Sequence, residues 1–275
     1  MVSFYEDFLL DQHIYSKCEI DAYNNALPRS QAGQYHTIFW IDDDLSSHLF
    51  DNSLDSMSWF LGYNTNLLLG GWETVYWLAG DGPLYPEHFL YDNFGISQVS
   101  HNSNFDFIGA FGQNGWPDLI TDTDNIFGGI LPSVSAFDIL PGAQVIYTFN
   151  SSSDDPQFEN QPCGVLYNDG SGINIALAFP IYHLTDESAQ ALINKVIETF
   201  GIESNIVFGD ANGDESINLM DITFLISYLY KQGPSPVYPN NADANGDCTI
   251  SLLDITYLIS YLYKGGPPPL EGCVN

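Results

Sequence analysis

The chain has 275 residues, of which 45% are hydrophobic and 15% aromatic, enough to bury the cores of one large domain and one small one. Its 35 acidic residues oppose only five Lys and Arg, which gives a formal charge of −30. Such a charge repels phosphate backbones and anionic membrane surfaces, so it argues against a nucleic-acid partner, and no apolar run reaches the roughly 18 to 20 residues of a membrane span.

The first residues, MVSFYEDFLL, lack the basic start and continuous apolar run of a signal peptide. We therefore expect a mature chain or one cut from a longer precursor. The excess of carboxylates is compatible with a secreted protein in a calcium-containing medium, although an ordinary solvated acidic surface accounts for most of it.

Residues 1–204 alternate short β-rich runs with helical patterns, which predicts an α/β layered sheet. The apolar runs HTIFWI and INIALAF are typical of central strands that are covered on both faces. Strands are expected at 18–23, 36–42, 66–71, 143–149, 163–169 and 173–179, and helices at 53–62, 73–79, 84–92 and 186–200.

The helix at 186–200 has the clearest pattern. Thr185 or Asp186 can cap its start, and Gly201 ends it. Its apolar face is predicted from residues that recur at helical spacing, namely Leu192, Val196 and Phe200.

Residues 205–275 contain a repeat of about 33 residues, and we expect them to form a separate small all-α domain. DANGDESINLMD (210–221) is followed by ITFLISYLYK, and DANGDCTISLLD (243–254) by ITYLISYLYK. Each copy therefore predicts a loop followed by a helix. Each helix is expected to end at a Lys in its last turn, followed by Gly and Pro, which stop a helix.

Each dodecapeptide has the donor spacing of a calcium loop. Side-chain oxygens at positions 1, 3 and 5 can converge on one cation, position 7 offers its backbone carbonyl, and position 12 returns a carboxylate from the following helix. Two loops in register make an ordinary solvated turn a poor explanation, and we expect one Ca²⁺ in each. The predicted ligands are Asp210, Asn212, Asp214, Ser216, Asn218 and Asp221 in the first loop, and Asp243, Asn245, Asp247, Thr249, Ser251 and Asp254 in the second.

Without the ion, the carboxylates of a loop would face each other at close range. Folding of the small domain is therefore expected to be coupled to calcium binding. The loops depart from the EF-hand, because position 12 is Asp, position 6 is Glu215 or Cys248, and no helix precedes the first loop.

Residues of about 207–270 resemble the type I dockerin domain, whose pattern is two loop–helix repeats with Asp at the last ligand position. The resemblance implies a secreted module that binds a cohesin domain through positions 10, 11, 17, 18 and 22 of each repeat. Those positions are Leu219, Met220, Ile226, Ser227 and Lys231 in the first copy, and Leu252, Leu253, Ile259, Ser260 and Lys264 in the second.

This predicted partner face is unusually apolar for the family, since well-studied dockerins often have Ser, Thr and basic residues there. Three partners stay open: an unusual cohesin, the larger domain of the chain itself, or a second copy. Because the two copies are nearly identical, a partner could bind in either of two orientations.

Four cysteines allow three disulfide pairings in an oxidising compartment. We favour Cys248 with Cys273, since both belong to the C-terminal module and a bridge would hold the final tail. Cys18 and Cys163 would then form the second pair, and free thiols are the alternative.

Residues of about 1–204 resemble flavodoxin-like, class I glutamine amidotransferase-like domains of large secreted bacterial proteins. The resemblance is carried by QYHTIFWIDDD, LLLGGWETVYW, FDFIGAFGQNGWPDL and INIALAFPIYHLTDESAQALINKVIETFG. The first strand of such a fold is expected to be missing, because the chain starts at the helix-like FYEDFLL.

Catalysis in that family needs a nucleophilic Cys at a sharp strand-to-helix turn and a His base. The matching turn here, residues 69–73, reads LGGWE and has no nucleophile. His183 follows the last strand, where the family's His would fall, and is expected to be a loop or rim residue. Ser46 and Ser47, near His48, are not singled out by their spacing. We therefore predict a non-catalytic domain.

Two acidic runs, 42–44 and 121–125, could hold a further calcium ion but are more typical of exposed turns, and Asn150 lies in a sequon for N-glycosylation. Together, these patterns predict an extracellular, non-catalytic pair of modules attached through calcium to a cohesin-type partner. The alternatives are a structural subunit of a calcium-stabilised assembly or filament, and a component of a secreted hydrolase.

Overall fold

The structure is a computed structural model, and it describes residues 4–5, 18, 26–43, 49–124, 127–153, 157–168, 170–202, 207–214, 216–236 and 238–274. The chain forms two compact units, whose main parts are residues 17–202 and 203–275. This division falls close to the boundary expected after residue 204.

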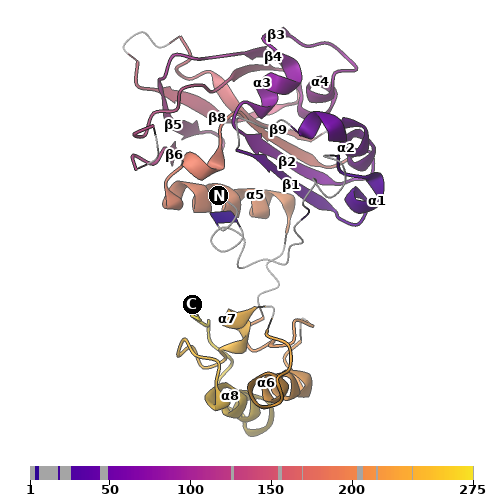
Figure 1. Cartoon of the computed structure of the whole chain (residues 1–275), viewed down its shortest axis with the longest axis vertical. Helices are drawn as coiled ribbons and strands as arrows, with labels where there is room; N and C mark the ends of the chain where they lie inside the picture. Colours follow the sequence, from indigo (N-terminus) through magenta and orange to yellow (C-terminus); the bar gives the residue numbers. More distant parts are fainter. Residues whose placement is uncertain are drawn as a thin grey trace. The chain divides into compact units, whose positions relative to one another are not determined.

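The first unit is built on a seven-stranded mixed sheet (Figure 1). The first three strands in its order are mutually parallel, and the other four pair antiparallel. The order is β1 (Thr37–Asp42), β2 (Asn66–Gly71), β10 (Ile173–Leu177), β9 (Pro162–Asn168), β8 (Gln144–Ser151), β5 (Phe107–Gly112) and β6 (Leu119–Ile120).

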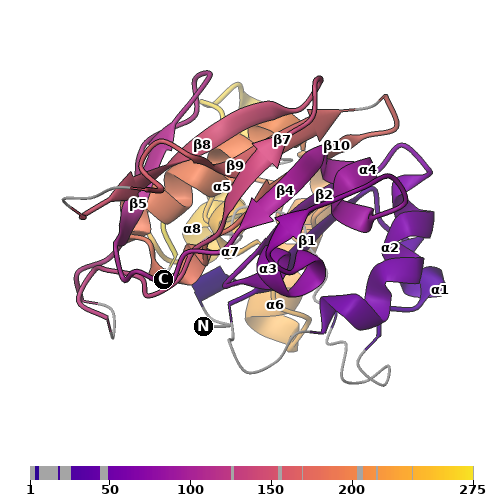
Figure 2. The same ribbon diagram turned by 90° about the horizontal axis from the view of Figure 1, so that it is seen from above.

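A second, antiparallel sheet contains β3 (Gly82–Pro83), β4 (Ile96–Ser100) and β7 (Ala136–Ile139). Figures 1 and 2 show α5 on one side of the large sheet, and α3 and α4 with the small sheet on the other. The helical segments of this unit are α1 (Arg29–Ala32), η3 (Phe50–Ser53), α2 (Leu54–Leu61), α3 (Thr74–Ala79), α4 (Phe89–Phe94), η4 (Ile181–His183) and α5 (Asp186–Phe200).

The mixed sheet confirms the α/β class but differs from a mostly parallel flavodoxin-like sheet. Among the strands that the structure describes, only β1, β2 and β10 form parallel pairs, because β8 and β9 form a hairpin that continues antiparallel into β10. Burial follows this layering, since Leu67, Leu68 and Leu69 on β2 are all completely buried.

Two helix predictions had different outcomes. For α5 the prediction is confirmed: Thr185 accepts a hydrogen bond from the Ser188 amide at 3.3 Å, and the helix ends at Gly201 with φ of 64°. The helix expected at 84–92 begins only at Phe89, because Glu87 has a φ of 80°, which a helix cannot contain. Of the strand expected at 18–23, only Cys18 is among the described residues.

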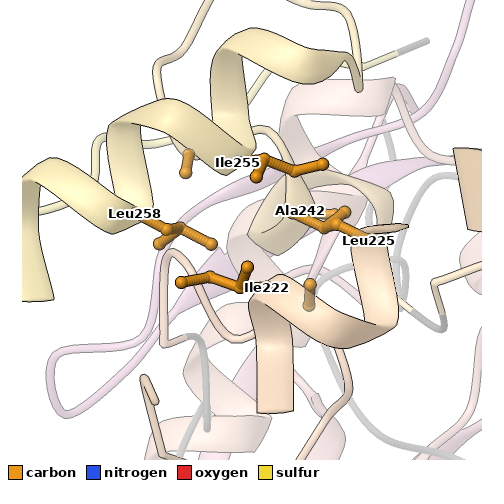
Figure 3. Close-up of a cluster of buried hydrophobic side chains, with 7 residues drawn as sticks. Ile222, Leu225, Ala242, Ile255 and Leu258 are labelled. Carbon is orange, nitrogen blue, oxygen red and sulfur yellow. The ribbon is translucent and has the colours of Figure 1, made fainter. Parts of the chain in front are cut away.

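The second unit contains two long helices, α6 (Leu219–Lys231) and α8 (Leu252–Lys264), and the short α7 (Pro239–Ala242). The two repeats contribute equivalent residues to one small core, which Figure 3 shows at the crossing of α6 and α8. This core consists of Ala211, Ile222, Leu225, Ala242, Ala244, Ile255 and Leu258, all buried. The predicted duplication is therefore a structural duplication, in which neither copy has a core of its own.

Candidate ion sites, helix surfaces and the turn after β2

Each candidate ion loop is joined to its helix by a capping box. In the first copy the Asn218 side chain accepts from the Met220 amide at 2.7 Å, and the Asn218 amide donates to Asp221 Oδ2 at 2.7 Å. In the second copy Ser251 and Asp254 make the equivalent pair. Asn218 and Ser251, at position 9 of their loops, therefore use their side chains to cap helices. A residue in this role would contact an ion through water.

The first loop brings its first and last residues together. Asp210, 2% exposed, accepts from the amides of Gly213 at 2.8 Å and Asp214 at 3.2 Å. Asp221, completely buried, accepts from the Asn212 amide at 3.2 Å. The loop backbone is thus folded around two carboxylates.

The second loop repeats this frame. Asp243 and Asp254 are both completely buried, the Asp247 amide donates to Asp243 at 3.1 Å, and the Asn245 amide donates to Asp254 at 3.2 Å. The remaining predicted ligands lie nearer the surface: Asn212 and Asn245 are partly buried, and Asp214, Ser216, Asp247 and Thr249 are exposed.

The electrostatics of both loops favour a bound cation. Burial raises the pKa of Asp221, and the facing Asp210 raises it further, against the effect of the two backbone amides. Burial likewise raises the pKa of Asp254, helped by Asp243 and Asp247. Buried carboxylates that face each other are costly unless a cation balances them.

The donor chemistry fits calcium. Among the described residues, no three Asp, Glu, His or Cys side chains converge on a metal position by themselves. Each loop instead combines two buried carboxylates with an Asn side chain, and the predicted ligand set adds a backbone carbonyl and a water. A hard ion that accepts six to eight oxygens in flexible geometry matches such a mixed set.

One disulfide is present, between Cys248 and Cys273, as expected. The expected second pair is wrong: Cys18 and Cys163 are both free. Cys163 is completely buried in β9, where burial raises the pKa of its thiol, whereas Cys18 is exposed. Because Cys163 is buried within a strand, its thiol is not accessible to the exposed thiol of Cys18.

The predicted partner residues fall into two groups. Leu219, Met220, Leu252 and Leu253 are 54–59% exposed at the starts of α6 and α8. Ile226, Ser227, Ile259 and Ser260 are partly buried, and the two isoleucines also pack against the small core. Lys231 and Lys264 are exposed in the last turns.

Two exposed tyrosines on these helices were missed by the sequence reasoning. Tyr230 is 61% and Tyr263 is 62% exposed, at equivalent places in the two copies. Each lies eleven residues after Leu219 or Leu252, which returns a helix to the same side. We call the residues Leu219, Thr223, Ile226 and Tyr230 the first apolar stripe, and Leu252, Thr256, Ile259 and Tyr263 the second.

The turn after β2 contains a residue in the left-handed conformation. Glu73 stands between β2 and α3 with a φ of 60°, a left-handed conformation uncommon for this residue type. Its Oε1 lies 3.7 Å from His101 Nε2, and the His101 ring stacks on Tyr76 with centroids 4.1 Å apart. The turn therefore carries a carboxylate and neither Cys nor Ser, and the imidazole beside that carboxylate comes from the residue after β4.

His183 lies closer to this turn than a rim position would allow. It is 7% exposed, and its ring meets Trp72 edge to face at 5.2 Å. Its Nδ1 is buried with no hydrogen-bond partner among the described residues, and burial lowers its pKa although Asp122 acts the other way. The expectation of a rim histidine is therefore wrong, because the ring packs against aromatic side chains.

The further acidic runs lie partly outside the described residues, which do not include Asp44, Asn125, or Ser46, Ser47 and His48. In the described part, Asp43 Oδ2 accepts from the Tyr182 amide at 3.0 Å, and Asp122 accepts from the Asp124 amide at 2.9 Å. The Asp122 contact is local, as in the ordinary turns that the sequence also allowed. Asp43 differs from an exposed turn residue, because it is 4% exposed and its contact joins residues 139 positions apart.

Comparisons with known proteins found a family model that matches part of the second unit. Residues 208–263 match the family model of the Dockerin type I domain, which supports a type I dockerin in this segment. No curated protein matches the chain significantly. Among the helices that the structure describes, none is long and apolar enough to cross a membrane.

Solved structures similar to the chain share little sequence with it. The GH42 beta-galactosidase Gan42B of G. stearothermophilus is 10% identical over 62% of this chain and 22% of its own length, with a TM-score of 0.42. A beta-galactosidase of the haloarchaeon Halorubrum lacusprofundi is 16% identical over 64% and 24%, with a TM-score of 0.42. A cytoplasmic protein of Salmonella typhimurium LT2 is 12% identical over 64% and 77%, with a TM-score of 0.38. The chain thus spans about a quarter of the two beta-galactosidases, and TM-scores at this level establish no shared fold.

Proposed function

We propose that residues 207–274 attach this chain, outside the cell, to a cohesin-type protein domain, and that two calcium ions hold the attachment module in its binding form. The observation that carries the proposal is the duplicated frame of hydrogen bonds around Asp210 with Asp221 and around Asp243 with Asp254. The match to the dockerin family model over 208–263 supports it.

In this proposal calcium acts through folding. Asp221 and Asp254 each stand at the third position of a helix, so an ion bound by them also fixes the starts of α6 and α8. The side chains that would hold the ions are the twelve predicted ligands, with Asn218 and Ser251 acting through water. Residues 207–275 contain eight acidic residues and two lysines, so the ions also relieve repulsion within the module.

The apolar stripes would then form the partner surface. The exposed Leu219 and Tyr230 on α6 are matched by Leu252 and Tyr263 on α8, so the module presents the same chemistry twice. Amphipathic helices commonly bind partner proteins through such apolar rows. Either stripe could therefore bind the partner.

We also propose that the first unit is an amidotransferase-like domain without catalytic activity. The sharp turn after β2 supports the assignment, and Glu73 at the place of the nucleophile supports the loss of activity. A hydrolase role would require turnover of amide or glycoside substrates that is lost on His183→Ala. Such turnover would refute the non-catalytic assignment.

Calcium binding is tested by titration calorimetry on the full chain, where we expect two sites. The double variant Asp210→Ala with Asp243→Ala should bind at neither, whereas the control Asp138→Ala, an exposed acid in the first unit, should keep both. Absence of calcium binding by the wild type would refute the proposal.

Attachment is tested with purified cohesin domains in gel-shift assays, with calcium and with chelator. We expect complexes only with calcium, retained in Leu219→Ser or Leu252→Ser and lost in the double variant. Size measurement on the chain alone separates the rival function: a calcium-dependent polymer without any cohesin would favour self-assembly, and a monomer would count against it.

A further inference from the structure

One difference between the two ion loops, at position 6, is the place where the tail of the chain is bonded to the second loop. Position 6 is Glu215 in the first loop and Cys248 in the second, and Cys248 is bonded to Cys273, 25 residues further on. The disulfide therefore ties the tail directly to an ion loop, in one repeat and not in the other.

The tail also follows the second loop through its backbone. The Leu270 amide donates to the Ala244 carbonyl at 3.0 Å, and the Val274 amide donates to Asn240 Oδ1 at 2.9 Å. Between these contacts, Gly272 packs so closely against the backbone of Asn240 that a side chain would not fit. The tail is thus bound on both sides of the disulfide.

The contact that matters for the ion is made at Asp243, the first residue of the second loop. Its Oδ1 accepts from the Asp247 amide at 3.1 Å, and its Oδ2 accepts from the amides of Cys248 at 2.9 Å and Cys273 at 3.0 Å. Both cysteines of the disulfide therefore hold the same carboxylate oxygen. The other oxygen, Oδ1, accepts from the amide of Asp247 and keeps a second lone pair that an ion could take.

We propose that the Cys248–Cys273 disulfide positions Asp243 as a calcium ligand, so that the second ion site, and not the first, depends on the oxidised state of the chain. The inference rests on the proposed calcium binding. Hydrogen bonds from outside the ligand shell fix the orientation of a ligand, and losing one typically weakens metal binding about 10- to 100-fold.

Reduction by a dithiol breaks the sulfur–sulfur bond. The reductant supplies two electrons and two protons, which convert Cys248 and Cys273 to thiols, and the reductant becomes a cyclic disulfide. Without the covalent link, the noncovalent contacts of the tail, among them the hydrogen bonds of Leu270 and Val274, keep the Cys273 amide beside Asp243. Whenever the tail detaches, the entropy of ordering it again is added to the cost of ion binding.

The two loops carry their own reporters, because Gly213 and Gly246 occupy the same position in each. The experiment labels glycine with ¹⁵N in the full chain and follows both amide signals during calcium titration, in the wild type and in Cys248→Ser with Cys273→Ser. Cys18→Ser, which removes an exposed free thiol, is the matched control.

We expect the double variant to raise the Kd read at Gly246 about tenfold or more, and to change the Kd read at Gly213 less than about twofold. The control should leave both values unchanged. Equal weakening at the two glycines would mean that the disulfide only stabilises the module as a whole, and no weakening would mean that it does not position Asp243. Either result overturns the inference. A wild type in which neither signal responds to calcium overturns the proposed function itself.

A second measurement covers the case in which the double variant does not fold. The calcium-loaded wild type is mixed with excess chelator before and after treatment with a dithiol, and ion release is followed by stopped flow. We expect reduction to accelerate one of two release phases. Acceleration of both phases or of neither contradicts the inference.

Discussion

Replacing Leu225 by Ala tests how the C-terminal module is held together. Leu225 is completely buried in a core of seven residues, three of them alanines, so little else can fill the space it leaves. A Leu-to-Ala change in a core costs about 2–5 kcal/mol. A module of this length has a total stability of roughly 3–10 kcal/mol at the usual stability per residue.

Calcium should partly offset this loss. An ion at a hundred times its Kd stabilises the form that binds it by about 2.7 kcal/mol, so two sites supply about 5 kcal/mol. We therefore expect Leu225→Ala to be folded with saturating calcium and largely unfolded in chelator. The measurement is urea unfolding of the full chain, followed by circular dichroism with saturating calcium and with chelator. The transition that shifts with calcium reports the stability of the module.

Leu219→Ala is the matched control. It removes the same atoms from the same helix, but Leu219 is 54% exposed, so its cost should be below about 0.5 kcal/mol. Equal losses in the two variants, or a loss below about 1 kcal/mol for Leu225→Ala, would refute the reasoning, because the core would then not carry the stability of the module.

Three further predictions concern acidity and capping. The pKa values of Asp221 and Asp254 are raised on folding, so the module without calcium should become less stable as pH rises from about 4 through those raised values. Urea unfolding at a series of pH values from 4 to 7 measures this loss of stability, and saturating calcium should remove it. Because burial lowers the pKa of His183, the unfolded state binds a proton on this imidazole more readily than the folded state. The first unit should therefore lose stability as pH falls through about 6.5. His183→Gln should reduce this loss in acid unfolding curves compared with the wild type, and an unchanged dependence of stability on pH would contradict the prediction. Gln232 ends α6 with a φ of 58°, where the second copy has Gly265, so Gln232→Gly should raise the unfolding free energy by about 1 kcal/mol, and a decrease would show that its side chain stabilises the helix end.

Local patterns predicted the parts of the fold that depend on neighbouring residues. The cap at Thr185, the end of α5 at Gly201 and the last-turn lysines of α6 and α8 were all readable, because each depends on residues within a few positions. The same local reasoning failed for the start of α4, since the left-handed Glu87 is not signalled by residue type.

Contacts between distant residues were harder to predict. Spacing cannot show that Cys163 is completely buried in β9, nor that His183 packs on Trp72, which lies far from it in the sequence. The strand β10 pairs antiparallel with β9, which directly precedes it, and parallel with β2, which lies about 100 residues earlier in the chain. Which strands pair depends on side-chain packing and burial across the whole sheet, and not on residues near each strand in the sequence.

The sequence by itself determined that this chain carries two matched ion loops, because the donors of each loop lie within twelve residues and their spacing alone predicts where the oxygens meet. Only the tertiary structure decided that the repeats share one core, that Tyr230 and Tyr263 extend their exposed stripes, and that Cys273 reaches Asp243. The physical reason is that these contacts join segments 30 or more residues apart, whose approach depends on burying a common apolar surface and not on local backbone preference.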